Sequence, residues 1–179
     1  PSLISYIGLA LGDVADAIVV GNKLGVTGLA AISIALPFFM IINVIMHGFG
    51  AGGAIVYSRL MGEGNRDQAI RSFNSVLRVS IIISVILAAA GNIFMEPLLG
   101  VLGTEPADGE LYRTSYEYLQ IIAIGTPFIM ISYILNYYLR NAGSEKLASF
   151  AFTVGNIVDI VLNIILVLVV RMGVRGAAL

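Results

Sequence analysis

The sequence lacks several residue types on which soluble enzymes and small secreted domains depend. Among its 179 residues there is no cysteine and no tryptophan, and His47 is the only histidine. The absence of cysteine excludes disulfide frameworks, thiolate metal sites and a cysteine nucleophile. One histidine cannot form a histidine metal cluster, and hydrolase signatures such as HExxH are missing. We therefore expect neither an enzyme with catalytic residues nor a protein with an organic cofactor.

Charged residues are also scarce. The chain has 10 basic and 11 acidic residues, which together make up 12% of the sequence and leave a net charge of −1. A typical soluble domain has about 25% charged residues, and a chain this close to neutral has no basic surface for nucleic acid. Hydrophobic residues reach 58%, and the mean hydropathy is +0.94. So few charges cannot cover a 19.0 kDa protein in water, and the composition therefore predicts a membrane protein.

Long apolar runs separated by short polar segments divide the chain. About 20 helical residues cross the hydrocarbon core of a bilayer, and these runs lack the alternation of a membrane barrel. We therefore predict an all-α fold, a polytopic transmembrane helical bundle that forms a single domain over residues 1–179. Five spans and the start of a sixth are expected, with the five at about residues 1–22, 31–57, 74–95, 117–139 and 147–170. Because Pro1 opens inside an apolar run and another run begins near Gly173, we expect a fragment of a longer protein.

The distribution of lysine and arginine predicts the orientation in the membrane. The segment GNKLGVTG, residues 21–28, is the expected connection between the first two spans and carries one lysine. The opposite side of the membrane holds four basic residues. The connections after the second and fourth spans hold six: Arg59, Arg66, Arg71, Arg78, Arg140 and Lys146. Cytoplasmic connections are enriched in basic residues. We therefore expect these two connections in the cytoplasm and the long acidic connection, residues 96–117, outside.

Three carboxylates interrupt the apolar spans. Asp13, Asp16 and Asp159 would each cost about 2.5–3.5 kcal/mol at the membrane centre on insertion scales. Asp13 and Asp16 are three residues apart, so they share one helix face. Two carboxylates this close in a low dielectric cannot both stay ionised comfortably, so one of them is suited to carry a proton. With amide oxygens nearby, such acids can instead hold Na⁺ through hard oxygen ligands.

The fifth span supplies partners for these acids. Asn156, Asp159 and Asn163 recur at spacings of three and four residues, which places them on one stripe of a helix. The stripe is polar within an Ile/Leu/Val segment, so it is expected to face the bundle interior or a cavity. We predict a cation site at Asp16, Asp159 and Asn163 that holds H⁺ or Na⁺, with Asp13 and Asn156 as additional members. For Asp13, the alternatives are that it is solvated or paired outside the site. The alternative is that the amides only hydrogen-bond neighbouring helices.

Small residues in the second span predict a close helix contact. Gly48 and Gly52, with Ala54 nearby, form the expected packing face. The adjacent His47 is expected to be hydrogen-bonded in the interior or at an interface, and a proton relay is its alternative role.

Two further residues are candidates to line a substrate path. Tyr133 in the fourth span could meet aromatic cations through cation–π contact. Anchoring at the membrane interface is the alternative reading of the tyrosines at this end of the span. Asn43 in the second span is the other candidate.

Four segments of the chain resemble, in order and spacing, those of one transporter family. They are VADAIVVGNKLG at 14–25, VYSRLMGEGNRDQA at 56–69, PFIMISYILNYYLRNAGSEK at 127–146 and GNIVDIVLNIILVLVVRMGVRGAAL at 155–179. With these motifs the chain resembles the first half of the multidrug and toxic compound extrusion (MATE) family of secondary transporters. The likeness spans nearly all of its length.

The resemblance implies a fold and a function. Members have twelve helices in two pseudosymmetric six-helix lobes around a central cavity, and they export drugs and organic cations in exchange for H⁺ or Na⁺. The chain would then be the N-terminal lobe of such an antiporter, multi-pass in the inner (plasma) membrane. Its partners would be membrane lipid, small-molecule organic cations or drugs, and the C-terminal lobe of the same protein.

The resemblance also implies a cation site in this lobe. The first-helix aspartate and the polar groups of the fifth helix correspond to Asp16, Asp159 and Asn163. Some members have Asn and then Asp four residues apart on the fifth helix, whereas here Asp159 precedes Asn163. This reversal leaves the choice between H⁺ and Na⁺ open. Asp13 replaces what is often an amide or a small residue and adds a further acid.

Two other functions compete with drug export. A lipid-linked oligosaccharide flippase of the same superfamily would need Arg and Lys in its cavity for pyrophosphate, and no such residue lies in mid-span here. A non-transporting membrane scaffold would tolerate apolar replacements of the mid-span acids without a phenotype.

Overall fold

The computed structural model describes the backbone of residues 2–169 and 175–176, and the side chains of residues 25–158, 160–162, 165–167 and 175–176. Within these residues every regular element is helical, which confirms the predicted all-α class. The four long helices are α1 (Ser2–Gly62), α2 (Arg66–Ile93), α4 (Glu110–Asn141) and α5 (Glu145–Asn163). The short elements are α3 (Met95–Leu102), the 3₁₀ turn η1 (Pro106–Asp108) and the π-helical turn η2 (Ile164–Val169).

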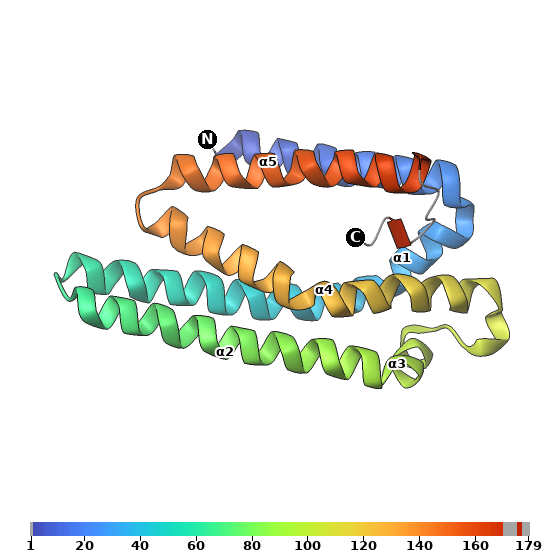
Figure 1. Ribbon diagram of the computed structural model, residues 1–179, viewed down its shortest axis with the longest axis horizontal. Helices are drawn as coiled ribbons and strands as arrows, with labels where there is room; N and C mark the ends of the chain where they lie inside the picture. Colours follow the sequence, from blue (N-terminus) through green and yellow to red (C-terminus); the bar gives the residue numbers. More distant parts are fainter. Residues whose placement is uncertain (1, 170–174, 177–179) are drawn as a thin grey trace.

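The first helix, α1, is broken at Gly25. The segment 21–28, which we expected to connect two spans as a polar loop, is helical except at this residue, whose backbone has φ 62° and ψ −157°. Glycine adopts such dihedrals because it has no Cβ. Figure 1 shows the chain leaving the level of α5 and bending into the level of α2 and α4. A single residue therefore replaces the expected loop, since one pair of non-helical dihedrals is enough to redirect the helix.

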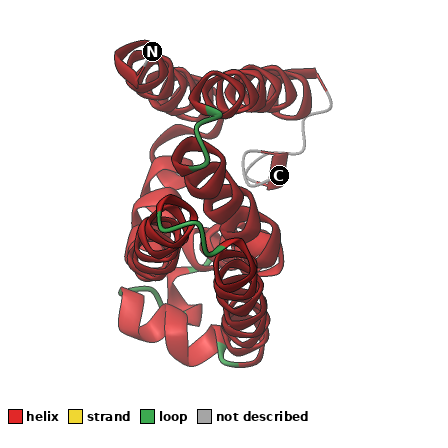
Figure 2. Ribbon diagram, turned by 90° about the vertical axis from the view of Figure 1, so that its left-hand side faces the viewer, coloured by secondary structure: helices red, strands yellow, loops and turns green. Residues whose placement is uncertain are grey.

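The helices form two layers. In one layer α1, after its break, packs with α2 and α4, and each of these helices contacts the other two. The second layer contains α5 and the first part of α1, residues 2–24, which lie along the same edge of the molecule in both Figure 1 and Figure 2. α1 and α5 are also in contact.

Four helical stretches are long and apolar enough to cross a membrane: Gly25–Gly62, Arg66–Ile93, Glu110–Asn141 and Glu145–Val167. Their outward side chains are aliphatic, as on α2, where Ile82, Val85 and Ile86 are 58%, 52% and 58% exposed. An apolar surface of this extent fits lipid rather than water. The expected first span, residues 1–22, falls in the part of the chain whose side chains are not described, and its boundaries remain a prediction.

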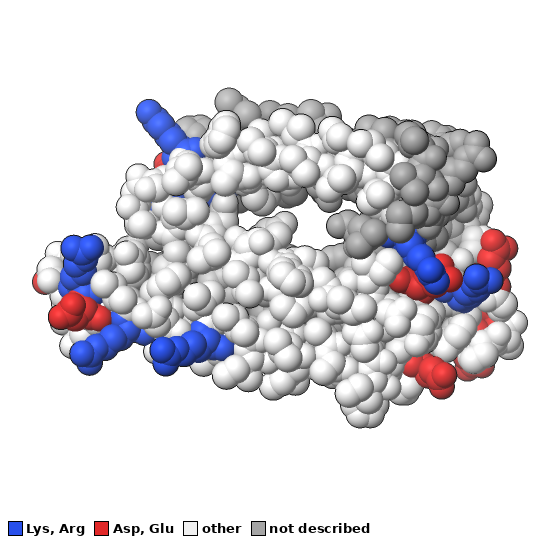
Figure 3. Space-filling view, in the orientation of Figure 1, with Lys and Arg blue, Asp and Glu red and all other residues white. Residues whose placement is uncertain are grey.

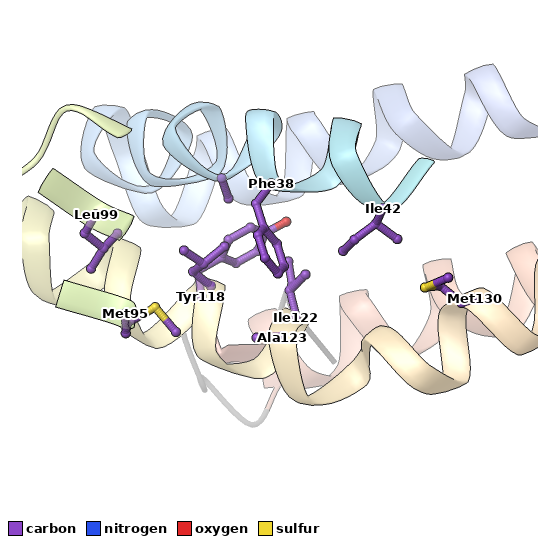
Figure 4. Packing of buried hydrophobic residues seen from close by; sticks show 10 residues of the cluster. Phe38, Ile42, Met95, Leu99, Tyr118, Ile122, Ala123 and Met130 are labelled. Carbon is purple, nitrogen blue, oxygen red and sulfur yellow. The ribbon is translucent and has the colours of Figure 1, made fainter. Parts of the chain in front are cut away.

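A buried apolar cluster joins three helices at one end of the molecule. Figure 4 shows Phe38 and Ile42 of α1, Met95 and Leu99 of α3, and Tyr118, Ile122, Ala123 and Met130 of α4 converging on it. Leu99 and Ala123 are fully buried. Because the short helix α3 contributes two of these side chains, it is held against α1 and α4 rather than extending α2.

A second contact between helices depends on two glycines of α1. A Cβ at Gly50 would lie 2.6 Å from the ring of Tyr137, and a Cβ at Gly53 would collide with the hydroxyl of Tyr138. Both tyrosines belong to α4, so the missing side chains let α1 and α4 approach closely. The prediction that Gly48 and Gly52 form this face is wrong, because both are exposed and a Cβ there would meet nothing within 4 Å. Ala54, which was predicted with them, is fully buried in a cluster with Ile134 and Tyr138 of α4.

Candidate functional site

A cavity lies between α4 and α5. Its volume is about 420 Å³, which falls within the range of about 300–1,000 Å³ typical of small-molecule sites. Figure 3 shows the molecule hollowed between these two helices. The lining side chains are Ser132, Tyr133, Leu135, Asn136 and Leu139 of α4, and Ala151, Phe152, Gly155 and Asn156 of α5.

Two aromatic rings, one from each helix, contact each other in the wall of this cavity. The rings of Tyr133 and Phe152 meet edge to face, with centroids 6.1 Å apart and planes at 82°. Aromatic pairs in this arrangement contribute about 0.5–1.5 kcal/mol beyond the burial of their area. The pair therefore links α4 to α5, and Tyr133, which the sequence suggested for a substrate path, lies on the cavity wall.

The side chain of Asn136 links the two helices beside the connection between them. Its Nδ2 donates a hydrogen bond of 3.1 Å to the backbone oxygen of Ala148 in the first turn of α5. Its Oδ1 accepts a hydrogen bond of 2.9 Å from Nε of Arg140. Both ends of the amide are thus engaged, which fixes its orientation and ties α4 to the start of α5.

The described part of the cavity wall is mainly apolar, with a few polar and no charged side chains. Asn136, Asn156 and Ser132 offer amide and hydroxyl groups, and no lysine, arginine, aspartate or glutamate is among the described lining residues. Such a surface combines hydrogen-bonding groups with apolar and aromatic contacts. This is the composition of a site that takes a small organic molecule rather than a phosphate.

The backbone places the predicted cation ligands on two neighbouring helices. Asp13 and Asp16 lie on the first part of α1, and Asp159 and Asn163 lie on α5. Figures 1 and 2 show these two stretches in one layer. The four side chains themselves lie outside the described residues, so the cation site stays a prediction. The fifth predicted member, Asn156, is partly buried and lines the cavity.

Asn43 and His47 occupy an exposed part of α1. The amide of Asn43 donates to the backbone oxygen of Phe39 at 3.0 Å, and Asn43 is not among the residues that line the cavity. Nδ1 of His47 lies 2.8 Å from the backbone oxygen of Asn43. A carbonyl only accepts, so Nδ1 is the donor in this contact. The His47 ring also meets the edge of Tyr137 at 5.7 Å, which places it at the interface of α1 and α4.

Sequence reasoning missed Asn136 and Phe152. Both follow from helical spacing once one cavity residue is known on each helix, because Asn136 lies three residues after Tyr133 and Phe152 four residues before Asn156. The missing information was which face of α4 meets which face of α5.

Comparisons with known proteins agree with this fold. The MatE family model matches residues 1–165. The chain is 30% identical to a protein of Shewanella oneidensis named "FAD transporter", over 100% of this chain and 40% of the relative. It is 26% identical to "Probable multidrug resistance protein YoeA" of Bacillus subtilis, over 99% of this chain and 39% of the relative. The chain thus spans about 40% of the length of these curated relatives.

A solved structure repeats the likeness in three dimensions. The MATE multidrug transporter DinF-BH superposes with a TM-score of 0.90 at 29% identity, over 99% of this chain and 39% of that one. The names of these relatives refer to transport or to drug resistance, and none of them names an enzyme. These relatives and the four apolar helices together identify the chain as a multi-pass protein of the plasma membrane. Because the family model covers residues 1–165, the chain belongs to the MatE family, the multidrug and toxic compound extrusion transporters that its sequence motifs resemble.

Proposed function

We propose that this chain forms one lobe of an antiporter that exports drugs and organic cations in exchange for H⁺ or Na⁺. The observation that carries the proposal is the cavity between α4 and α5, whose described lining is aromatic and aliphatic and holds no charged side chain. A flat organic cation can stack against Tyr133 or Phe152 and meets no repulsion from a basic group in the described wall. The relatives named as multidrug proteins support the same class of cargo.

In this proposal the cation site drives the conformational cycle. Asp16, Asp159 and Asn163 would bind the ion, and Asp13 would supply a further acid in the same part of α1. Binding of one H⁺ or Na⁺ lowers the negative charge of the cluster by one and so reduces the cost of burying it in the membrane. The break at Gly25 gives α1 a point at which its two parts can change their relative tilt. The flows are coupled only if the ion binds the two states with different affinities.

A flavin dinucleotide is the alternative cargo, because one relative is named as an FAD transporter. The aromatic rings of the cavity could hold its ring system. Its pyrophosphate, however, would need cationic partners, and no lysine or arginine is among the described residues that line the cavity. We therefore place organic cations first, and the same reasoning disfavours a lipid-linked oligosaccharide as the cargo.

Transport into everted vesicles tests the proposal. The vesicles carry the complete transporter to which this lobe belongs, and a fluorescent organic cation reports uptake after a H⁺ or Na⁺ gradient is imposed. Asp16→Asn should abolish gradient-driven uptake while the protein still inserts. Glu110→Gln is the matched control, since it removes the charge of an exposed carboxylate at the start of α4.

Three outcomes decide between the readings. Normal uptake by Asp16→Asn removes this residue from the coupling mechanism. Uptake of FAD in place of the cation reverses the choice of cargo. No gradient-driven uptake by the unmodified transporter, and no phenotype when Asp16 and Asp159 are replaced by apolar residues, would favour the scaffold reading.

A further inference from the structure

A second cavity lies at the end of the molecule that carries most of the basic residues. Its volume is about 220 Å³, and we call it the α2–α4 groove. It is lined by Tyr57 of α1, Ile70 and Phe73 of α2, and Leu135, Tyr138, Leu139 and Ala142 of α4. Every lining side chain is aliphatic or aromatic, so an occupant must be largely apolar.

The wall of the groove is an interlocked aromatic cluster. The ring of Tyr138 meets the ring of Phe73 at 4.8 Å and the ring of Tyr57 at 5.5 Å, both at 70°. These contacts join three helices and hold the wall in place without an occupant. On either side of the wall the groove opens to the lipid-facing surface, because Ile70 is 43% and Leu135 38% exposed.

Exposed arginines of α2 lie beside this groove. Arg66 precedes Ile70 by four residues and Phe73 by seven, so it shares their face of the helix, at the basic end of the groove. Arg71 directly follows Ile70 and lies about 100° further round the helix, so it reaches the headgroup position through its long side chain. Neither arginine has an acidic partner among the described residues, whereas Arg59 pairs with Glu63 at 3.6 Å. Figure 3 shows basic side chains gathered at this end of the molecule.

We propose that the α2–α4 groove binds an anionic phospholipid, with an acyl chain along the aromatic wall and the phosphate at Arg66 and Arg71. The apolar groove can bury an acyl chain. The two guanidinium groups, which have no acidic partner in the described chain, can hydrogen-bond the negatively charged headgroup. Basic clusters beside a membrane helix attract the anionic lipids of the cytoplasmic leaflet, at about 1 kcal/mol for each Lys or Arg. An anionic lipid in the groove thus agrees with the cytoplasmic position predicted for this end of the molecule. The proposal goes beyond transport and does not depend on it.

Binding of defined lipids to the purified full chain in detergent tests the site. The probes are phosphatidylglycerol, phosphatidylcholine with the same acyl chains, and glycerol 3-phosphate, and native mass spectrometry counts the bound molecules. Two arginines at about 1 kcal/mol each correspond to about 30-fold tighter binding of phosphatidylglycerol than of phosphatidylcholine. Glycerol 3-phosphate should not compete, because it lacks the chain that fills the groove.

Variants separate the headgroup contact from the groove. Arg66→Gln with Arg71→Gln should lower the affinity for phosphatidylglycerol to that for phosphatidylcholine. Arg113→Gln, which removes one charge at the opposite end, should leave it unchanged. Leu135→Trp fills the groove and should weaken both lipids while the arginines remain.

Several results would overturn the proposal. Equal affinity of the unmodified chain for the two lipids does so without any variant. Competition by glycerol 3-phosphate shows a free phosphate site, and unchanged binding in Leu135→Trp shows that the groove is not used. Undiminished binding in the double arginine variant excludes the headgroup contact.

Discussion

Replacement of Gly53 by alanine tests the close packing of α1 against α2 and α4. A Cβ at this position would collide with the hydroxyl of Tyr138 and would lie 3.1 Å from both methyl groups of Val76. At Gly52, the preceding residue, a Cβ would meet nothing within 4 Å. The two substitutions are chemically identical and lie in the same helix. They differ in what the added methyl group contacts.

The expected difference follows from two opposing terms. Alanine stabilises a helix interior by about 1 kcal/mol relative to glycine. Overpacking of a filled contact costs about 1–3 kcal/mol. Gly52→Ala is therefore expected to raise the free energy of unfolding by about 1 kcal/mol, and Gly53→Ala to change it by anything from about zero to a loss of about 2 kcal/mol. For a chain of this size each kcal/mol shifts Tm by about 2–4 °C.

Tyr138→Phe identifies the colliding atom. The hydroxyl of Tyr138 is buried and has no hydrogen-bond partner among the described residues, so its removal should be neutral or stabilise the protein by about 1 kcal/mol. Combined with Gly53→Ala, it should recover most of the lost stability, because the new methyl group then faces only a ring edge and Val76. The non-additivity of the pair measures the contact directly.

Circular dichroism in detergent is the suitable measurement, because the chain has no tryptophan for intrinsic fluorescence. Thermal unfolding is recorded for the unmodified chain, the three single variants and the double variant Gly53→Ala/Tyr138→Phe. Equal Tm values for Gly52→Ala and Gly53→Ala would refute the packing argument. A deficit in Gly53→Ala that Tyr138→Phe leaves untouched would show that the hydroxyl is not the obstacle.

Three further predictions concern the cavity and the end opposite the groove. Asn136→Ala removes the bond to Ala148 and should speed amide hydrogen exchange in the first turn of α5, with a cost of about 1 kcal/mol; unchanged exchange would contradict the link. Tyr133→Ala should weaken binding of a fluorescent organic cation in a titration of the complete transporter, whereas Tyr133→Phe should retain it; a loss in both variants would point to the hydroxyl instead. Glu117→Gln removes the partner of Arg113 and Arg175 at an exposed site, so it should cost about 1 kcal/mol or less at low salt and less still at high salt. A salt-independent loss in Glu117→Gln would argue against an ionic origin.

The helices could be predicted from the sequence because an apolar run in lipid has few backbone solutions. Every backbone N–H and C=O must be satisfied within the segment, which leaves the helix when no barrel pattern is present. Which face of each helix meets its neighbour could not be predicted in the same way. Gly48 and Gly52 match the spacing of a packing face as well as Gly50 and Gly53 do, and the choice depends on the tyrosines that α4 presents. Asp13, Asp16 and Asp159 could be singled out because a charge in the middle of a membrane span is energetically costly. This criterion does not require knowing which residues surround them.

The position of Asn136 shows how such tertiary information bears on mechanism. Nothing in the run from Leu135 to Tyr137 distinguishes this amide from an interfacial residue, since its partner, the backbone oxygen of Ala148, is reached through the turn between α4 and α5. Separation of α4 from α5 at the basic end requires this bond to break, at a net cost of about 1 kcal/mol. That cost is well below the roughly 5.5 kcal/mol of differential affinity needed to reverse an equilibrium completely. A bond of this size therefore favours contact between α4 and α5 at this end without fixing the two helices there.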